Sequence, residues 1–405
     1  MPPPGPPPFQ PSADYLTSLA AEISKSTAEY GSSPSPNGLQ KIISATQALN
    51  LAATGPMDRL FNLAFQAHIN GAIRIAIGMK LFDNLPSDLS QSIPLPALAS
   101  QCNSTSDFTL RIARALVTNH LIESPSPGAY AHSTVSKLVL TVPTAQALFI
   151  HIFDTMTHGM TYFGPYFAEH GYDSPTDAKN SPAAFARGYK DMSFFETLTR
   201  DPERLTAFNM GMGATNAIGA HVAATTYPFW ELGEEGKTVL VDVGGGRGQA
   251  LQEIRRTYPD MKGTMVLQDL KYVLDEGTLL GEDEVELCPY NFFEEVQPVE
   301  GAKAYFLKSI FHDWPDDSCR TILRNMKPAM RGHDSRLLLC ETVLQDEQPI
   351  ARDALRDINM LVIAGKERSV KQWDDLLQSE HFVIEKIHGL DGRMSAIIEA
   401  RLKED

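Results

Sequence analysis

Four glycines within five positions follow a short apolar run and form the most informative motif of the chain. Because glycine lacks a Cβ and tolerates positive φ, a ligand can approach the backbone closely at such a turn. A dinucleotide-binding turn carries G-x-G-x-x-G, and its last glycine would fall where this chain has Gln249. Gly244, Gly246 and Gly248 give G-x-G-x-G instead. We interpret this spacing as typical of an S-adenosylmethionine site rather than an NAD site.

Two carboxylates accompany the glycine turn. Asp242 lies in the apolar run that leads into it, and Asp269 ends the next predicted strand, 21 residues past Gly248. Acidic side chains suit the cationic ammonium and sulfonium groups of S-adenosylmethionine, whereas a pyrophosphate is anionic. A carboxylate at the end of the second strand can accept both hydroxyls of a ribose. A lone aspartate would more often cap a helix, so the prediction rests on the turn and Asp269 together.

His312 is the candidate general base, because imidazole is the side chain that titrates near neutrality. It lies in the segment Leu307–Asp317, directly after a third apolar run. In an open parallel sheet, such a position falls on the rim where ligands bind. We expect Asp316 to cap the following helix and Trp314 to pack.

The second half of the chain alternates apolar runs with helical patterns, which predicts an α/β fold with a mostly parallel sheet covered on both faces. The predicted strands are Thr238–Val243, Thr264–Gln268, Ala304–Leu307, Arg336–Cys340, Phe382–Ile387 and Met394–Ala400, and the helices between them include Asp317–Met330 and Val370–Ser379.

A helical region precedes this half. Apolar residues recur at spacings of three and four between Leu60 and Leu85, and two short helices, Pro94–Ser100 and Ser106–Val117, precede a hairpin. Two helices followed by a hairpin are the elements of a winged helix, a fold that often binds DNA. The net charge of −15 and the scarcity of basic residues in this segment argue against nucleic acid as a partner. We therefore predict a dimerisation or lid role.

The composition sets the broad class. The chain has 405 residues, of which 43% are hydrophobic and 21% charged, as in globular proteins of two or three domains. No uncharged apolar run reaches about 18 residues, so no membrane segment is expected. The four cysteines form no C-x-x-C pair and are predicted to be buried free thiols. We expect a cytoplasmic protein whose Pro- and Ser-rich residues 1–38 form a flexible tail.

Several motifs in order resemble one family. They are Val241–Gly248, Gln268–Leu270, Phe311–Asp316, Cys340–Thr342 and Gly365–Ser369. Together they are similar to the class I S-adenosylmethionine-dependent O-methyltransferases of plant caffeate type, and most of all to their fungal secondary-metabolite branch, over about residues 60 to 400. The resemblance implies a winged-helix-like, mainly helical dimerisation domain at 39–165, a Rossmann-like seven-stranded methyltransferase domain at 166–405, and a homodimer.

The resemblance also implies roles for individual residues. His312 matches the family's catalytic base, and Glu341 and Glu367 match the acidic residues that flank and orient it. No metal is expected. The positions matching the site of the cofactor S-adenosyl-L-methionine are Asp242, Gly244, Gly246, Asp269, Asn291, Phe292 and Lys308, and those matching the acceptor pocket are Met212, Asn359, Met360 and Asp313.

Two positions depart from the family pattern. Asn291 stands where many relatives have an aspartate next to the adenine, and Asn216 where they have a small hydroxyl residue. Either amide can still form neutral hydrogen bonds.

The implied reaction is methylation of a hydroxyl, phenolic in the first instance, of a small aromatic or polyketide-derived metabolite. An alternative is a pericyclase with this fold and cofactor that transfers no methyl group, in which Lys308 or His132 would donate a hydrogen bond. The complete set of His312, Glu341 and Glu367 argues against it, since a pericyclase has no evident need of a base. A non-catalytic DNA-binding regulator is a third possibility, which the acidic charge opposes.

Overall fold

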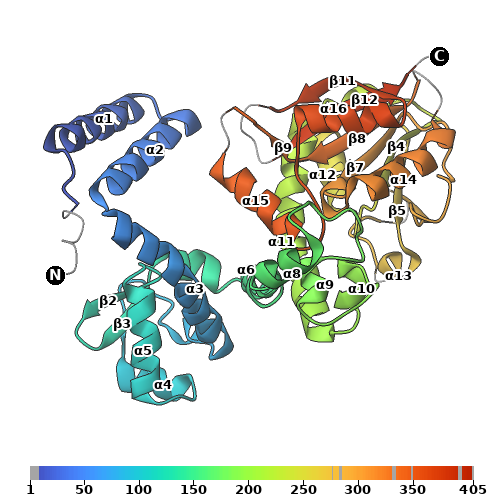
Figure 1. Cartoon of the computed structure of the whole chain (residues 1–405). Helices are drawn as coiled ribbons and strands as arrows, with labels where there is room; N and C mark the ends of the chain where they lie inside the picture. The colour runs from blue at the N-terminus through green and yellow to red at the C-terminus, as the bar shows by residue number, and fades with distance from the viewer. Residues whose placement is uncertain are drawn as a thin grey trace. The chain divides into compact units, whose positions relative to one another are not determined.

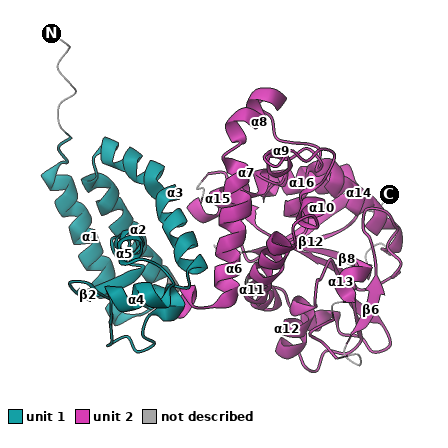
Figure 2. Cartoon of the chain, turned by 90° about the horizontal axis from the view of Figure 1, so that it is seen from below, with its two compact units in different colours: residues 1–137 teal, residues 138–405 magenta. Residues whose placement is uncertain are grey.

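The computed structural model describes residues 9–275, 277–281, 285–330, 334–347, 350–390 and 395–403 (Figure 1). The chain divides into two compact units, Met1–Lys137 and Leu138–Asp405 (Figure 2). This division lies before the boundary predicted between residues 165 and 166. None of the helices in the described ranges combines the length and apolar character needed to cross a bilayer.

The first unit begins with three helices, α1 (Ala13–Ser32), α2 (Pro36–Ala53) and α3 (Pro56–Gly78). Here the structure differs from the expected flexible tail, because α1 and the start of α2 fall within residues 1–38. The side chain of Ser12 accepts a hydrogen bond from the backbone of Tyr15 and caps α1, and proline stands at the first position of α2, where its missing N–H costs nothing. Residues 1–8 lie outside the described part.

The predicted winged-helix outline is confirmed in the rest of this unit. Helices α4 (Leu95–Gln101) and α5 (Ser106–Val117) precede the hairpin of β2 (Ile122–Ser126) and β3 (Ala129–His132). A short strand, β1 (Ile93–Pro94), pairs with β3, so the antiparallel sheet has the order β1-β3-β2.

The second unit opens with helices that precede its sheet. The longest is α11 (Pro202–Thr226), which packs along α6 (Pro143–His151) and α12 (Gln249–Thr257). The shorter ones are the π-helix η3 (Ile152–Thr157), α7 (His158–Met160), α8 (Phe163–His170), α9 (Pro182–Phe185) and α10 (Phe194–Leu198).

A seven-stranded sheet of order β11-β12-β8-β7-β4-β5-β6 forms the centre of this unit and confirms the Rossmann-like prediction. Strands β4 to β8 are mutually parallel, and β12 runs antiparallel to β8 and β11. The bounds are β4 Thr238–Val243, β5 Thr264–Asp269, β6 Glu286–Pro289, β7 Ala304–Lys308, β8 Arg336–Glu341, β11 Phe382–His388 and β12 Ala396–Leu402.

Helices cover both faces of the sheet. Alternate strand residues explain this, because Tyr305 and Leu307 of β7 pack on one face and Ala304 and Phe306 on the other. Helices α14 (Asp316–Met326) and α16 (Val370–Ser379) cover the first face, and α11, α12 and α13 (Lys271–Leu274) cover the second. The strand order reverses between β4 and β7, which places the expected ligand crevice outside the carboxyl ends of these two strands.

Candidate active site

The glycine turn after β4 is closely packed on one side and open on the other. Gly244, Gly246 and Gly248 all have positive φ, of 72°, 60° and 84°, which L side chains rarely adopt. A Cβ at Gly244 would lie 2.7 Å from Cδ1 of Ile310, so the end of that side chain would have to move to accommodate it. A Cβ at Gly246 would meet only one atom within 4 Å, at 3.8 Å. The backbone at Gly246 is therefore accessible to a ligand.

Asp242 lies at the end of β4 and is 1% exposed. Its Oδ2 has no hydrogen-bond partner among the described residues. Burial is the main cause that raises the pKa of Asp242 to about 7, against the opposing charge of Lys308 and with a smaller contribution from the charge of Asp269. A buried carboxylate oxygen without a partner fits a ligand that carries a cationic donor.

Lys308 and Asn216 lie next to each other, although they are far apart in the sequence. Lys308 ends β7, and its Nζ donates a hydrogen bond to Oδ1 of Asn216 on α11 at 3.1 Å. The charge of Lys308 also acts on Asp242. Lys308 therefore lies close to Asp242, and so on the same side of the crevice as the glycine turn.

Asp269 ends β5 and binds the glycine turn directly. Its Oδ2 accepts the backbone N–H of Gly246 at 2.8 Å, and its Oδ1 accepts that of Leu270 at 2.7 Å. Burial raises the pKa of Asp269, and these two hydrogen bonds oppose the rise. Each carboxylate oxygen retains a second lone pair, so hydrogen bonds to ribose hydroxyls are still possible.

Asn291 and Phe292 follow β6. Oδ1 of Asn291 accepts the backbone N–H of Phe293 at 3.1 Å and so closes its own loop. The ring of Phe292 lies 3.6 Å from the position that a Cβ of Gly244 would take. Phe292 is thus beside the turn, whereas the Oδ1 of Asn291 already has a partner.

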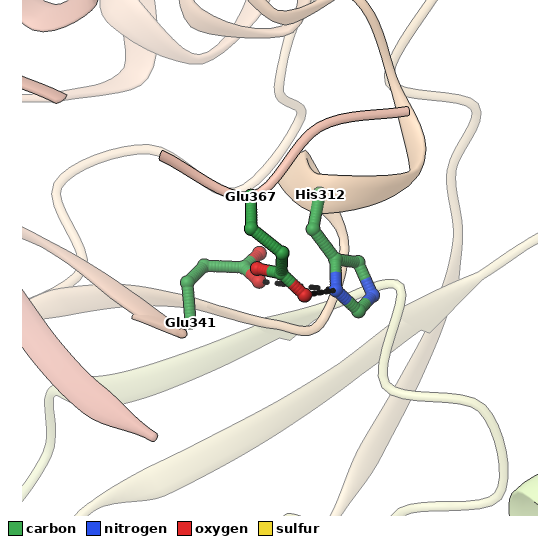
Figure 3. Close-up of side chains that lie close together, drawn as sticks. All are labelled: His312, Glu341 and Glu367. Carbon is green, nitrogen blue, oxygen red and sulfur yellow. Dashed lines mark hydrogen bonds and ion pairs between the residues drawn. The ribbon is translucent and has the colours of Figure 1, made fainter. Parts of the chain in front are cut away.

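His312 lies in the short helix η5 (Phe311–Asp313) that follows β7, and its side chain is 18% exposed. Its Nδ1 is 3.1 Å from Oε1 of Glu367 and 3.9 Å from Oε2 of Glu341. Its Nε2 is 3.4 Å from Oδ1 of Asp313. Figure 3 shows both glutamates on the Nδ1 side of the ring, which leaves Nε2 on the opposite side. The structure thus brings the three predicted catalytic residues together.

Two short strands bring the glutamates to the histidine. Glu341 ends β8, and Glu367 directly precedes β10 (Arg368–Ser369). Strand β10 pairs in parallel with β9 (Val343–Leu344), which begins two residues after Glu341. The Oε1 of Glu341 also accepts the backbone N–H groups of Ile310 and Phe311 at 2.9 and 2.8 Å. That carboxylate therefore holds the loop that carries His312.

Arg368 supports the same loop and was not predicted as a site residue. Its guanidinium is fully buried and donates to the backbone oxygens of Phe311 and Trp314, both at 3.0 Å, and to Oδ1 of Asp316 at 2.7 Å. The interaction with Arg368 replaces the capping role expected of Asp316, because the N-cap of α14 is Pro315. The type and position of Arg368 carry no signal of this role in the sequence.

Gly365 is a second supporting residue that the prediction missed. A Cβ at Gly365 would overlap the carbonyl oxygen of His312. That oxygen accepts the backbone N–H of Lys366 at 2.8 Å. The segment leading to Glu367 can therefore approach His312 only because residue 365 has no side chain.

The charges around His312 favour its protonated form. Burial alone lowers the pKa of His312, but the negative charges of Asp313, Glu341 and Glu367 outweigh this effect and raise it to about 10. Burial also raises the pKa of Asp313 to about 7 and that of Glu341 above its usual value. The second oxygens of Glu341 and Glu367 are buried without hydrogen-bond partners among the described residues.

The residues predicted to contact the acceptor lie on different elements. Asp313 is beside Nε2 of His312, and Met360, near the end of α15 (Ala351–Leu361), is 8% exposed and packs in an apolar cluster with Phe194. Met212 on α11 and Asn359 on α15 are half-buried. The structure brings neither of them into a described hydrogen bond or ion pair with His312.

His312, Glu341 and Glu367 have the composition of a metal site. One ligand atom from each of His312, Glu341 and Glu367 lies within 4.8 Å of the others, and they form the single group of this kind in the described part of the chain. The arrangement can therefore stabilise a positive charge, whether that charge is an imidazolium or a bound cation. The prediction that no metal is needed stays a prediction.

Comparison with known proteins gives consistent matches. A family model described as an O-methyltransferase domain matches residues 173–383, and one described as an O-methyltransferase dimerisation domain matches residues 61–142. The chain is 34% identical over 397 residues to O-methyltransferase GME11366 of Pestalotiopsis microspora, with 96% of each chain covered.

Solved structures match over nearly the whole chain. The crystal structure of OxaC superposes with a TM-score of 0.86 at 22% identity and covers 96% of this chain and 99% of that one. A structure described as a pericyclic reaction enzyme superposes with a TM-score of 0.83 at 24% identity and covers 97% and 100%. These likenesses concern the fold.

Proposed function

The chain belongs to the O-methyltransferase family, whose methyl donor is S-adenosyl-L-methionine, and on this premise we propose that it methylates a phenolic hydroxyl of a small aromatic or polyketide metabolite with His312 as general base. The observation that carries the proposal is the position of His312 after β7, with Nδ1 between two buried glutamates and Nε2 on the other side of the ring. A base held in this way presents a single nitrogen to a substrate.

On the donor side, S-adenosyl-L-methionine supplies an electrophilic methyl group when it is bound. Asp242 would then pair with the ammonium group, which would give the orphaned Oδ2 a cationic partner. Asp269 would accept hydrogen bonds from the ribose with the lone pairs that its backbone contacts leave open. The other residues proposed for this side of the crevice are Gly244, Gly246, Asn291, Phe292 and Lys308.

On the acceptor side, His312 removes the proton of the attacking hydroxyl. A phenol with a pKa of about 10 faces an ordinary imidazole of about 6.5, a gap that opposes proton transfer before methyl transfer. The three carboxylates raise the pKa of His312 to about 10 and so close this gap. Glu367 and Glu341 stabilise the imidazolium that forms, and Met212, Asn359, Met360 and Asp313 are the proposed acceptor contacts.

The substitution His312→Ala tests the proposal. We expect turnover to fall by about 10² to 10⁴, the usual contribution of a general base, while calorimetry shows S-adenosyl-L-methionine binding unchanged. His221→Ala, which removes a 60% exposed histidine paired with Glu253, serves as the matched control and should retain full turnover. Unchanged turnover in His312→Ala would remove His312 from the mechanism.

The second candidate is a pericyclase that keeps the methyl-donor site but transfers no methyl group. The likeness to a structure described as a pericyclic reaction enzyme supports it, and the family names of the relatives favour methylation. Purified protein incubated with S-adenosyl-L-methionine and the aromatic metabolites of its host distinguishes the two. Formation of S-adenosylhomocysteine together with a product heavier by one methylene unit supports methylation, and product without S-adenosylhomocysteine supports the pericyclase.

We further propose that the protein is a homodimer formed through its first unit. The match to a dimerisation domain over residues 61–142 supports this assembly.

A further inference from the structure

Two arginines of the second unit have buried guanidinium nitrogens that lack hydrogen-bond partners among the described residues. Arg204, in the first turn of α11, is 9% exposed, and neither Nη1 nor Nη2 has a hydrogen-bond partner among the described residues. Its Nε donates to Oγ1 of Thr155 at 3.3 Å. Arg187 donates through Nη2 to the backbone oxygen of Asp154 at 2.7 Å, and its buried Nη1 is also without a partner. Both side chains are therefore anchored on consecutive residues of η3.

A histidine completes this cluster. His151 ends α6, directly before η3, and is 4% exposed with an Nδ1 that has no hydrogen-bond partner in the described part of the chain. Burial, and after it the charge of Arg204, lower the pKa of His151 to about 4, so the ring is neutral at pH 7.

The positive charge of this cluster is only partly balanced. Arg187 and Arg204 each carry a charge, and the pKa of Arg204 is lowered first by burial and then by Arg187. Asp201 and Tyr189 act on Arg204 in the opposite sense, and Asp154 acts on Arg187. No carboxylate of the described residues forms an ion pair with either guanidinium, and the Oδ1 of Asp201 instead accepts the backbone N–H of Arg204. Buried, unpaired charge of this kind is costly unless an anion binds.

Aromatic rings border the cluster and lead towards the base. His151 is 5.2 Å from Phe208 and 6.3 Å from Phe194, measured between ring centroids. Further ring contacts extend this group. The ring centroids of Phe208 and Phe195 are 6.0 Å apart, and those of Phe195 and Trp314 are 5.3 Å apart. Trp314 lies two residues after His312. An anionic aromatic group could therefore be attracted by the positive charge of the arginines and packed against the neighbouring aromatic rings.

We propose that Arg204 and Arg187, with His151 as a neutral neighbour, form a binding site for the carboxylate of an aromatic acid. This inference rests on the proposed function, because it identifies the acceptor class as aromatic metabolites that carry an acidic group. Guanidinium groups bind carboxylates through paired N–H donors, which is the chemistry that Nη1 and Nη2 of Arg204 leave unused.

Benzoate, with benzamide as its neutral isostere, is the probe. In chloride-free buffer without a methyl donor, benzoate at millimolar concentration should raise the Tm of the full chain by several degrees, and benzamide should not. Calorimetry should show benzoate binding to the wild type and at least tenfold weaker binding to Arg204→Met. Because the buried charge is then gone, Arg204→Met without ligand should melt at the same temperature as the wild type or higher.

The controls separate this site from the proposed reaction. Arg200→Met, which removes an exposed arginine that precedes α11 and lies four residues before Arg204, should bind benzoate as the wild type does. Arg187→Met repeats the test with the second guanidinium if Arg204→Met does not fold. Absence of benzoate binding to the wild type, or equal stabilisation by benzamide, would overturn the inference. Neither readout involves methyl transfer, so failure of the proposed function would appear only in the S-adenosylhomocysteine assay.

Discussion

His312 has more negative charge around it than one imidazolium can neutralise. Its Nδ1 faces Glu341 and Glu367, and Asp313 lies 3.4 Å from its Nε2. A histidine in this environment is a strong base that holds its proton at neutral pH. The reactivity of His312 as a base therefore depends on the fraction of the free enzyme in which its ring is deprotonated.

The first residue-scale prediction concerns pH. The folded pKa of His312 is about 10, above the ordinary 6.5, and only the deprotonated ring can accept the phenol's proton. At saturating donor, kcat/KM should therefore rise about tenfold per pH unit from pH 7 towards pH 9. An unperturbed histidine would give a plateau above about pH 7.5, and such a plateau would contradict the proposed environment.

Glu367→Gln provides the matched variant for this profile. The substitution keeps the shape of the side chain at Nδ1 but removes its charge, so the pKa of His312 should fall and the rise in kcat/KM should move by about one unit or more to lower pH. The limiting kcat should also fall, because the imidazolium loses stabilisation. A purely structural role of Glu367 would leave the position of the profile unchanged.

The second residue-scale prediction concerns Asp242. Its folded pKa of about 7 exceeds the unfolded value of 3.8, so the ionised carboxylate lowers stability as pH rises from about 4 to 7. Without ligand, Asp242→Asn should therefore melt several degrees above the wild type at pH 8 and close to it at pH 4. Calorimetry should show that its affinity for S-adenosyl-L-methionine is about 10- to 100-fold weaker. A lower Tm at pH 8 would show that Asp242 is structural.

At the scale of elements, the segment that leads into β10 passes close to the backbone of His312 and Asp313 at Gly365. Gly365→Ala should displace the carbonyl of His312 and reduce kcat about 10²-fold, since a misplacement of about 1 Å has an effect of this size. Donor affinity, measured by calorimetry, should be unchanged because the glycine turn is separate. Gly164→Ala in α8 is the control, because a Cβ there meets no atom within 4 Å. Equal kcat in the two variants would exclude a positioning role for Gly365.

Most strands were predictable from the sequence, because short apolar runs bounded by glycine, polar residues or turns have few alternative secondary structures in an α/β fold. Strand β6 was missed, since Glu286–Pro289 is a largely exposed edge strand without an apolar run. Helix α1 was missed because prolines, serines and glycines around it suggested a linker. The first unit's helix pair α4 and α5 was predicted within two residues at each end.

The site was predictable in part, for physical reasons that differ between its two sides. The glycine turn and Asp269 are separated by one helix and lie at adjacent strand ends, so their proximity follows from the fold class. His312 and Glu367 come together only through the short pair β9 and β10, which no residue spacing indicates. The resemblance supplied those residues, and the roles of Arg368 and Gly365 required the structure.

At the scale of the whole molecule, the first unit presents an apolar surface on α3. Leu63 is 69% exposed, and Met57, Leu60, Phe61 and Phe65 are each more than half exposed. Clustered exposed apolar side chains of this kind commonly mark a protein interface. We expect light scattering to give twice the chain mass of 44.6 kDa, and Leu63→Glu to shift the protein towards the monomer. Val296→Glu, at a 56% exposed position of the second unit, is the control, and a wild-type monomer would contradict the proposed homodimer.

The strand order of the large sheet has one more consequence. Starting from β4, the chain builds outward through β5 to β6, and it then returns to the centre and builds the opposite half through β7 and β8. Most of the proposed methyl-donor residues therefore lie in the stretch from β4 to β6, and the proposed base and its two glutamates lie in the stretch from β7 onward, where Lys308 is the exception on the donor side. On this proposal, substitutions confined to the later stretch can change the chemistry at the acceptor while Asp242, the glycine turn and Asp269 keep their arrangement.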